Sequence, residues 1–222
     1  MRIDSGAVFK IYYFVYLRLN INIIMKKSHS ILIFIISFFI TVSIFGQQQN
    51  LTQYVNPFVG TDYHGHTYPG AIVPFGMIQP GPDTRLDGWD GCSAYHYSDN
   101  IIYGFSHTHL SGTGCSDYGD ILLMPFTGNP SVINKEYASS FSHQNETASP
   151  GYYAVFLNKD KVKVELTASK RVAVHRYTFP DGGNKSKGVI IDLKHRDKVI
   201  FSKIQYDSKK NMIVGIRESS AW

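Results

Sequence analysis

Residues 152–179 read YYAVFLNKDKVKVELTASKRVAVHRYTF, and their regular alternation of apolar and polar side chains is the clearest sign of the fold. In the run from Lys161 to Thr167, one face carries Val162, Val164 and Leu166, and the other carries Lys161, Lys163 and Glu165. A period of two predicts a half-buried antiparallel strand. The runs 152–157 and 171–179 predict strands on either side of it.

Further strands are predicted downstream of this stretch. Residues 188–193, 201–206 and 212–217 are apolar runs separated by turns rich in Asp, Gly, Asn and Lys. No long helical period follows residue 46. We therefore expect an all-β protein, an antiparallel β-sandwich, and the roughly 175 residues after residue 46 are enough for one core. The chain stops at Trp222 without a turn or a polar tail, so we expect the sandwich to be incomplete at its C-terminal end.

Upstream of the strands, residues 56–126 are rich in Gly and Pro and hold both cysteines among His, Trp, Tyr and Asp side chains. Gly permits positive φ and Pro fixes φ, so such a segment forms long loops with set conformations. Ordered loops with polar and aromatic side chains are typical of a binding surface. We expect this sandwich to carry its ligand site on those loops.

The first 46 residues are predicted to be an upstream extension plus a signal peptide. Met25, Lys26 and Lys27 precede an apolar run, residues 31–45, which ends before Gly46 and a polar stretch. A retained membrane anchor is the alternative, but the run is short for the roughly 20 residues that a span requires. The two parts are then residues 1–46 and residues 47–222, with an exported, periplasmic or extracellular product and no membrane contact after cleavage.

The net charge of +5 arises mostly from this leader. Residues 1–46 carry five basic residues and one acidic residue, a net of +4, which leaves +1 for the remainder. The sequence pI of about 9.0 therefore does not indicate nucleic-acid binding. Neutral ligands fit the remainder better.

The two cysteines allow more than one interpretation. In an exported chain they suggest a disulfide between Cys92 and Cys115, worth roughly 3 kcal/mol in the chain-entropy account. The alternatives are two free thiols, or thiols that line the ligand site. Spacing alone does not show whether the Cα atoms lie within bridging distance.

Two His-x-His pairs are candidate metal ligands. His64 with His66, and His107 with His109, would each share a face if they lay on a strand, and a nearby aspartate could complete a zinc site. The favoured alternative is that these imidazoles bind loop backbone or a ligand hydroxyl, so no metal site is assigned.

The segment from Gly88 to Tyr97, GWDGCSAYHY, sets an aromatic side chain beside acidic and hydroxyl groups. Sugars are bound by stacking an apolar ring face on an aromatic side chain while Asp, Asn or His binds the hydroxyls. Trp89 would be the platform and Asp90 an acceptor. The alternative is that Trp89 is a core residue at a turn.

No hydrolytic machinery is marked by the sequence. Ser106, Ser111 and Ser116 lie near His and Asp residues, but no G-x-S-x-G elbow is present, and the glycine-rich run 111–119 lacks the ending of a phosphate-binding loop. Glycoside cleavage uses paired carboxylates, and nothing in the sequence singles out such a pair. The candidates are Asp83, Asp87, Asp90, Asp117 and Asp120.

Five blocks in order resemble the N-terminal domain of glycoside hydrolase family 92. They are YVNPFVGTDYHGHTYPGA (54–71), VPFGMIQPGPDT (73–84), GWDGCSAYHYSD (88–99), GFSHTHLSGTGCSDYGD (104–120) and GIRESSAW (215–222). The resemblance implies an exported bacterial α-mannosidase that is inverting and calcium-dependent. Its fold would be a β-sandwich domain followed by a larger (α/α)-barrel domain.

The resemblance also implies where function lies. The loops around Trp89 and Asp90 would help to shape the mannose pocket, and the substrate-binding candidates are Trp89, Asp90, His66, His96 and His109. The general acid, the general base and most ligands of the Ca²⁺ ion would belong to the second domain, so no catalytic residue is assigned here and the fragment is expected to be inactive alone. A free-standing carbohydrate-binding module and a metal hydrolase built on the His-x-His pairs are the competing hypotheses.

Overall fold

The computed structural model describes residues 29, 31 and 49–220. The chain divides into two units, Met1–Asn50 and Leu51–Trp222, and every strand belongs to the second. The predicted signal peptide lies almost entirely outside the described residues, as does Trp222. Among the residues that are described, no helix has the length and apolar character needed to cross a membrane.

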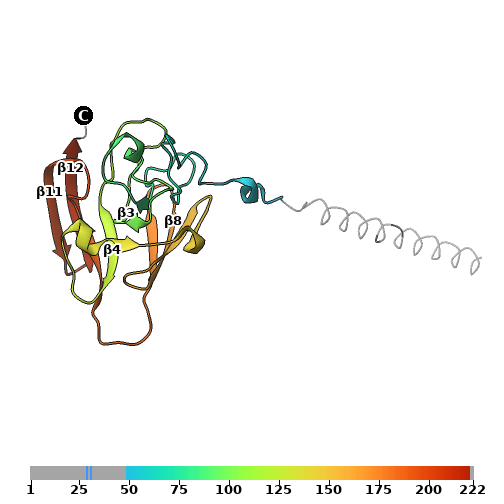
Figure 1. The fold of residues 1–222 in the computed structure, drawn as a ribbon. Helices are drawn as coiled ribbons and strands as arrows, with labels where there is room; N and C mark the ends of the chain where they lie inside the picture. The colour runs from blue at the N-terminus through green and yellow to red at the C-terminus, as the bar shows by residue number, and fades with distance from the viewer. Residues whose placement is uncertain (1–28, 30, 32–48, 221–222) are drawn as a thin grey trace, which may run out of the picture. The chain divides into compact units, whose positions relative to one another are not determined.

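Two four-stranded antiparallel sheets form the body of the second unit (Figure 1). The first has the order β1-β3-β4-β10, with β1 (Gly81–Asp83), β3 (Gly104–Ser106), β4 (Leu122–Thr127) and β10 (Lys187–Asp192). The second has the order β6-β7-β8-β9, with β6 (Glu146–Ser149), β7 (Tyr152–Leu157), β8 (Val162–Ala168) and β9 (Ala173–Thr178). Three consecutive hairpins build this second sheet because each strand pairs with the next.

The hydrophobic core lies between these sheets. β3, β4 and β10 contribute Phe105, Leu122, Met124 and Ile190, and β7 and β8 contribute Tyr153, Val155, Leu157, Val162, Val164 and Leu166. Each such large side chain, fully buried, stabilises the fold by about 1.5–3 kcal/mol. The predicted all-β sandwich is confirmed.

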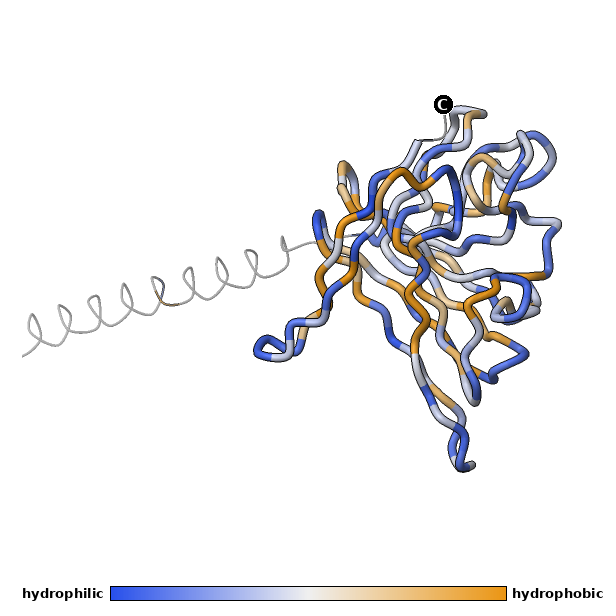
Figure 2. Tube along the Cα trace, turned by 90° about the vertical axis from the view of Figure 1, so that its left-hand side faces the viewer, coloured by the Kyte–Doolittle hydropathy of each residue, from blue (hydrophilic) through white to orange (hydrophobic). Residues whose placement is uncertain are grey.

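The alternation that predicted β8 is also confirmed. Val162, Val164 and Leu166 are buried and Lys163 is exposed, but Glu165, on the same face as Lys163, is also buried, and Tyr152 and Arg176 bind its carboxylate. On β9 the face of His175 and Tyr177 is half-buried and the face of Val174 and Arg176 is exposed. Figure 2 shows the same mixture of apolar and polar residues along the strands.

The remaining elements are short, apart from one ribbon. β2 (Ile101–Ile102) pairs with β5 (Ser139–Ser140), and β11 (Lys198–Asp207) pairs with β12 (Met212–Ser220). The helical pieces are η1 (Leu51–Tyr54), η2 (Trp89–Gly91), α2 (Asn134–Tyr137) and η3 (His143–Asn145). The ribbon extends beyond both strands predicted for it, and it leaves several large apolar side chains exposed. These include Phe201, Ile204, Tyr206, Ile213 and Ile216.

The glycine- and proline-rich loops gather at one end of the two sheets, drawn in teal to green in Figure 1. Their backbone takes positive φ at several residues, among them Gly88 (81°) and Gly114 (70°). Only glycine adopts this region without strain from a Cβ atom. Glycines such as these therefore lie where the loop backbone requires positive φ, as the glycine-rich sequence predicted.

Candidate functional site

An exposed tryptophan lies among three polar side chains on the loops. The Trp89 ring is 60% exposed, and its centroid lies 5.5 Å from that of His64 and 4.7 Å from that of His66. Nδ1 of His64 donates to Oδ1 of Asp90 at 2.9 Å. We call His64, His66, Trp89 and Asp90 the Trp89 cluster. It brings together three residues predicted to bind a sugar, Trp89, Asp90 and His66.

His66 is the most deeply buried member of this cluster. Its side chain is largely buried, and Nε2 lies 3.9 Å from Oδ1 of Asp90 without a hydrogen-bond partner among the described residues. Its carbonyl oxygen accepts from the amide of Gly112. Gly114 is pressed against both rings, because a Cβ placed there would lie 2.8 Å from Nε1 of Trp89 and 3.3 Å from Cε1 of His66. Only a residue without a side chain fits at this position.

Two arginines hold the turn that presents Trp89 and Asp90. Arg85 binds Asp99 through two nitrogens, at 2.6 and 3.2 Å, across the base of the loop. Arg196 reaches the same turn from the other side and donates to the carbonyl oxygens of Gly91 at 2.7 Å and Cys92 at 3.0 Å. A two-point guanidinium contact fixes orientation as well as distance. The tryptophan is therefore exposed on a braced turn.

The electrostatics of the cluster favour a charged carboxylate. The hydrogen bond from His64 lowers the pKa of Asp90, and the nearby imidazoles act in the same direction. Asp90 is accordingly an acceptor for ligand hydroxyls at neutral pH. A raised pKa, which a general acid needs, is the opposite of what this environment produces.

Two predicted sugar-binding residues are corrected by the structure. His96 is buried, donating from Nε2 to the Tyr63 carbonyl oxygen at 2.9 Å and bonding Ser98 through Nδ1. His109 has a fully buried side chain, with Nδ1 on the Gln79 carbonyl oxygen and Nε2 facing a carboxylate. Both imidazoles fix loop backbone, so neither presents a nitrogen to a ligand.

The carboxylate that binds His109 belongs to Asp83, at the centre of a buried network. Its Oδ1 lies 2.8 Å from Nε2 of His109 and accepts from Ser106 at 2.8 Å, and its Oδ2 lies 2.6 Å from Nε2 of His195. Burial opposes the charge of Asp83, but the two imidazoles outweigh it and hold the pKa below the usual range. Ser106 is buried and bound to Asp83, so it is not placed as a nucleophile.

The sequence did not predict this network. Asp83 was a candidate carboxylate, but His195 lies 112 residues further along the chain and no motif joins them. No signal in the sequence marks this pairing, because the two imidazoles meet Asp83 only in the folded chain. The network is a structural device that joins β1 to the segment after β10.

The two His-x-His pairs do not converge. His64 and His66 belong to the Trp89 cluster and His109 to the Asp83 network, while His107 donates to the carbonyl oxygen of Ile121 and stacks on His175 at 4.8 Å. Across residues 49–220, no group of three or more His, Cys, Asp or Glu side chains has the geometry to hold a metal ion.

The predicted disulfide is not formed. Cys92 and Cys115 are both free thiols. They are close enough for charge on Cys115 to affect Cys92, whose pKa is raised mainly by burial. Cys92 is buried below the turn of η2, and its sulfur interacts with the backbone of Gly114 rather than with a second sulfur.

The other candidate carboxylates are tied to the loops. Asp120 is bound by Arg217 and by the hydroxyl of Thr108, and Asp117 accepts from the amide of Tyr118 at 2.8 Å. Asp87 is exposed beside the turn of η2. The chemistry that the loops offer is therefore recognition, by an aromatic face with hydroxyl-binding groups around it.

Comparisons with known proteins identify the family of this chain. The sequence model of the "Glycosyl hydrolase family 92 N-terminal domain" matches residues 54–222. A family GH92 alpha-mannosidase from Bacteroides thetaiotaomicron, solved in complex with mannoimidazole, is 45% identical with a TM-score of 0.63, covering 66% of this chain and 20% of its own. A GH92 inverting mannosidase from the same organism is 31% identical with a TM-score of 0.66, covering 79% and 23%.

A curated relative gives a similar alignment. An uncharacterized secreted glycosidase of Arthroderma benhamiae is 30% identical over 182 residues, which are 77% of this chain and 22% of the relative. The chain thus spans about a fifth of the length of the relatives that it matches. On the match over residues 54–222 and the shared fold, this chain belongs to glycosyl hydrolase family 92, of which it carries the N-terminal domain.

Proposed function

We propose that this chain is the sugar-contacting N-terminal part of an inverting α-mannosidase that acts on α-linked mannose glycans. The observation that carries the proposal is the exposed ring of Trp89 beside His64, His66 and Asp90. Membership of family 92 and the mannosidases among the solved relatives support it.

The contacts follow from the chemistry of the cluster. The indole face of Trp89 would stack on the apolar face of a pyranose ring. Asp90, kept charged by His64, would accept from one hydroxyl, and His66 would support the indole ring through its edge contact at 4.7 Å. The braces from Arg85 and Arg196 keep these groups in place before the sugar arrives, which lowers the ordering cost of binding.

Catalysis is proposed to need residues outside this chain. An inverting enzyme places a general acid and a general base about 6.5–9.5 Å apart around the scissile bond. Asp83 is enclosed by two imidazoles and Asp120 is bound by Arg217, so neither is free for that work. We expect the acid and base on the remaining four-fifths of a family 92 enzyme, in its (α/α)-barrel domain. We expect the chain alone to show no turnover.

Calcium is proposed to be bound mostly by residues outside this chain. No group of three or more carboxylate, imidazole or thiol side chains within residues 49–220 is arranged for a metal ion. Most of the Ca²⁺ ligands are therefore expected in the barrel domain. Exposed apolar side chains on β11 and β12, such as Phe201 and Ile216, are the proposed contact with that domain. An exported location is proposed as well, and the secreted relative supports it.

A free-standing carbohydrate-binding module is the second candidate. It is favoured by one observation, that the Trp89 cluster and both of its arginine braces lie within the described residues. The test is titration of the chain with methyl α-mannoside, followed by NMR, with Trp89→Ala and with Tyr118→Ala, an exposed aromatic on another loop, as the matched control. Weak binding that Trp89→Ala removes, without hydrolysis, supports the enzyme-part proposal. Tight binding by the chain alone would favour the module, and binding indifferent to Trp89→Ala would refute both.

A further inference from the structure

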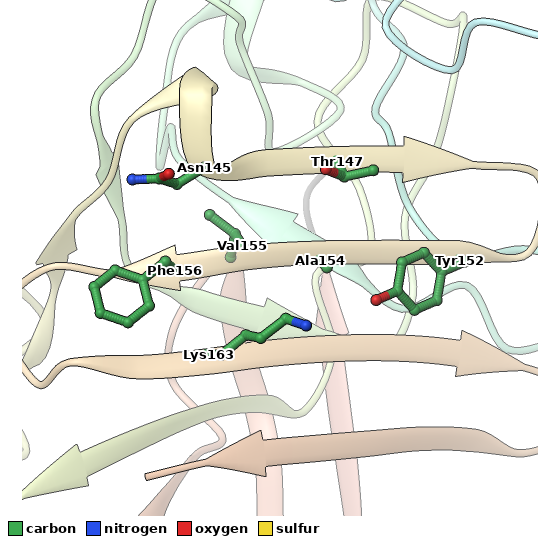
Figure 3. Close-up of a pocket in the computed structure, with 7 residues that line it drawn as sticks. All are labelled: Asn145, Thr147, Tyr152, Ala154, Val155, Phe156 and Lys163. Carbon is green, nitrogen blue, oxygen red and sulfur yellow. The ribbon is translucent and has the colours of Figure 1, made fainter. Parts of the chain in front are cut away.

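A groove of about 500 Å³ lies on the outer face of the sheet β6-β7-β8-β9 (Figure 3). It is formed by strands rather than by the loops that carry the Trp89 cluster. Its lining residues come from β6, β7 and β8 and from Asn145, which directly precedes β6. They are Asn145, Thr147, Tyr152, Ala154, Val155, Phe156 and Lys163.

The strand register explains why the lining residues of the strands, apart from the core residue Val155, share a face. Ala154 is paired with Thr147 on one side and with Glu165 on the other, and Phe156 is paired with Lys163. Residues directly opposite in an antiparallel sheet point to the same side. Tyr153 and Leu157, which alternate with them, point into the core. The outer row is therefore fixed by the same register that builds the core.

Two aromatic rings mark the ends of the groove. Tyr152 and Phe156 lie four residues apart on one strand, about 13 Å at the usual rise per residue. Ala154 lies between them with a side chain too short to fill the space, so the row dips at its centre (Figure 3). Phe156 is half-buried at one end of this dip.

The charges around the groove are largely matched among themselves. The hydroxyl of Tyr152 donates to Glu165 at 2.7 Å, and Arg176 binds the same carboxylate through two nitrogens at 2.7 and 2.6 Å. Lys163 lies 3.3 Å from Glu165. The hydrogen bonds from Arg176 and Tyr152 hold the pKa of Glu165 at about 2, so the pairs persist at neutral pH.

Because Arg176 and Lys163 are both engaged with Glu165, a ligand without net charge fits the groove without breaking an ion pair. Asn145 and Thr147 are exposed and supply an amide and a hydroxyl along one wall, and Lys163 extends over the other wall (Figure 3). Apolar rings separated by hydrogen-bonding groups match the alternating ring faces and hydroxyls of a carbohydrate chain. A free anion would instead have to compete with Glu165 for the same two cations.

We propose that this groove is a second carbohydrate-binding site, which takes an extended, neutral hexose oligosaccharide with one sugar ring on Phe156 and another near Tyr152. The site is separate from the Trp89 cluster and does not depend on the chain's being part of a mannosidase. Its role is to hold a stretch of glycan chain along the domain without cleaving it.

The test is calorimetric titration of the 222-residue chain with linear neutral oligosaccharides of mannose and of glucose. Phe156→Ala removes the ring and is expected to weaken binding about tenfold. Ala154→Leu fills the dip and is expected to abolish the binding that remains in Trp89→Ala. Thr178→Ala lies on the same face, opposite Lys163 but outside the groove, and should bind as the unmodified chain does. Trp89→Ala should retain binding at the groove.

Several results would overturn this inference. Unchanged affinity in Phe156→Ala and Ala154→Leu, loss of binding in Trp89→Ala, or no binding to any of the oligosaccharides would each do so. Binding that falls steeply with added salt would point to an anionic ligand and would also overturn it. Circular dichroism checks the fold of each variant, and Asn145→Ala, which changes an exposed side chain, tests the groove if Phe156→Ala does not fold. Loss of methyl α-mannoside binding in Trp89→Ala concerns the proposed function alone.

Discussion

His64 and Asp90 lie 26 residues apart and meet through a 2.9 Å hydrogen bond between Nδ1 and Oδ1. This contact joins the loop before β1 to the turn of η2, and it keeps the carboxylate charged next to the ring of Trp89. It is the link through which two separate segments of sequence become one recognition surface.

Removal of that imidazole should raise the pKa of Asp90. In His64→Ala the hydrogen bond that lowers the pKa is lost, so the carboxyl group should titrate closer to its ordinary range. The measurement is a carbon-detected NMR titration of the Asp90 carboxyl. Thr113→Ala, an exposed change on a neighbouring loop, is the control and should leave that titration where it was. An unmoved Asp90 in His64→Ala would show that the contact does not exist in solution.

Gly114 should be far less replaceable than Gly112. Both have positive φ, so an alanine at either position costs about 1–2 kcal/mol of backbone strain. At Gly112 the added Cβ meets open space, whereas at Gly114 it lies 2.8 Å from Nε1 of Trp89. Gly114→Ala should therefore also shift the fluorescence of Trp89 and weaken mannoside binding. Equal effects of the two alanines on both readouts would contradict the close packing.

Asp83→Asn should be strongly destabilising. The substitution removes a buried charge that faces His109 and His195, and breaking a buried ion pair from one side costs about 3–5 kcal/mol. Urea denaturation measures the loss. Asp181→Asn, on an exposed turn, is the matched control and should change the free energy of unfolding by less than about 0.5 kcal/mol. A loss of the same small size for Asp83→Asn would refute the network.

The free energy of unfolding should decrease as the pH is lowered below about 6.5. Burial, together with the charge of His107, lowers the pKa of His175 from 6.5 to about 3, and burial lowers that of His107 as well. Between pH 6.5 and pH 3 the unfolded chain binds more protons than the folded chain. The stabilisation from these histidines is therefore fully present above pH 6.5 and is lost progressively as the pH falls toward 3. The slope is at most about 1.4 kcal/mol per pH unit for each such histidine.

Urea denaturation at a series of pH values measures that slope. In His175→Gln it should be smaller, because one titrating group is gone. Thr178→Ala, a neutral change on the same strand, should keep the original slope. A slope unaffected by His175→Gln would place the acid sensitivity elsewhere.

The two thiols should differ in reactivity. Cys92 is 1% exposed and burial raises its pKa, so it should resist alkylation in the folded chain, while the half-buried Cys115 should react. Both should react in urea. Mass spectrometry of the alkylated chain reads the outcome, and a peptide pair linked through Cys92 and Cys115 would restore the disulfide interpretation.

The sequence predicted the strands from β7 onward well because each carries its own evidence, whereas β1 to β6 lie in or beside the loop-rich segment and were not predicted. In β8 the burial of Val162, Val164 and Leu166 follows from a period of two that a single strand displays. The same local reasoning found the Trp89 turn, since an aromatic side chain between glycines is visible in a few residues. A feature that depends on a few neighbouring residues can therefore be predicted from those residues alone.

The errors concern residues whose roles depend on distant partners. His96 and His109 resembled ligand-binding imidazoles, but each is buried against backbone supplied from elsewhere, Tyr63 for one and Gln79 for the other. The pairing of Asp83 with His195 spans 112 residues and follows only from the packed sandwich. The brace from Arg196 to the turn of η2 was missed for the same reason.

The central claim is that residues 54–222 act as the sugar-contacting part of a family 92 mannosidase. The most direct test replaces the matching segment of the Bacteroides thetaiotaomicron alpha-mannosidase, 45% identical to this chain, with these residues and measures α-mannosidase turnover with calcium and with chelator. We expect calcium-dependent turnover by the chimera, a large loss when it carries Trp89→Ala, and no turnover by the 222-residue chain alone. Turnover by the chain alone, or a chimera indifferent to Trp89→Ala, would contradict it.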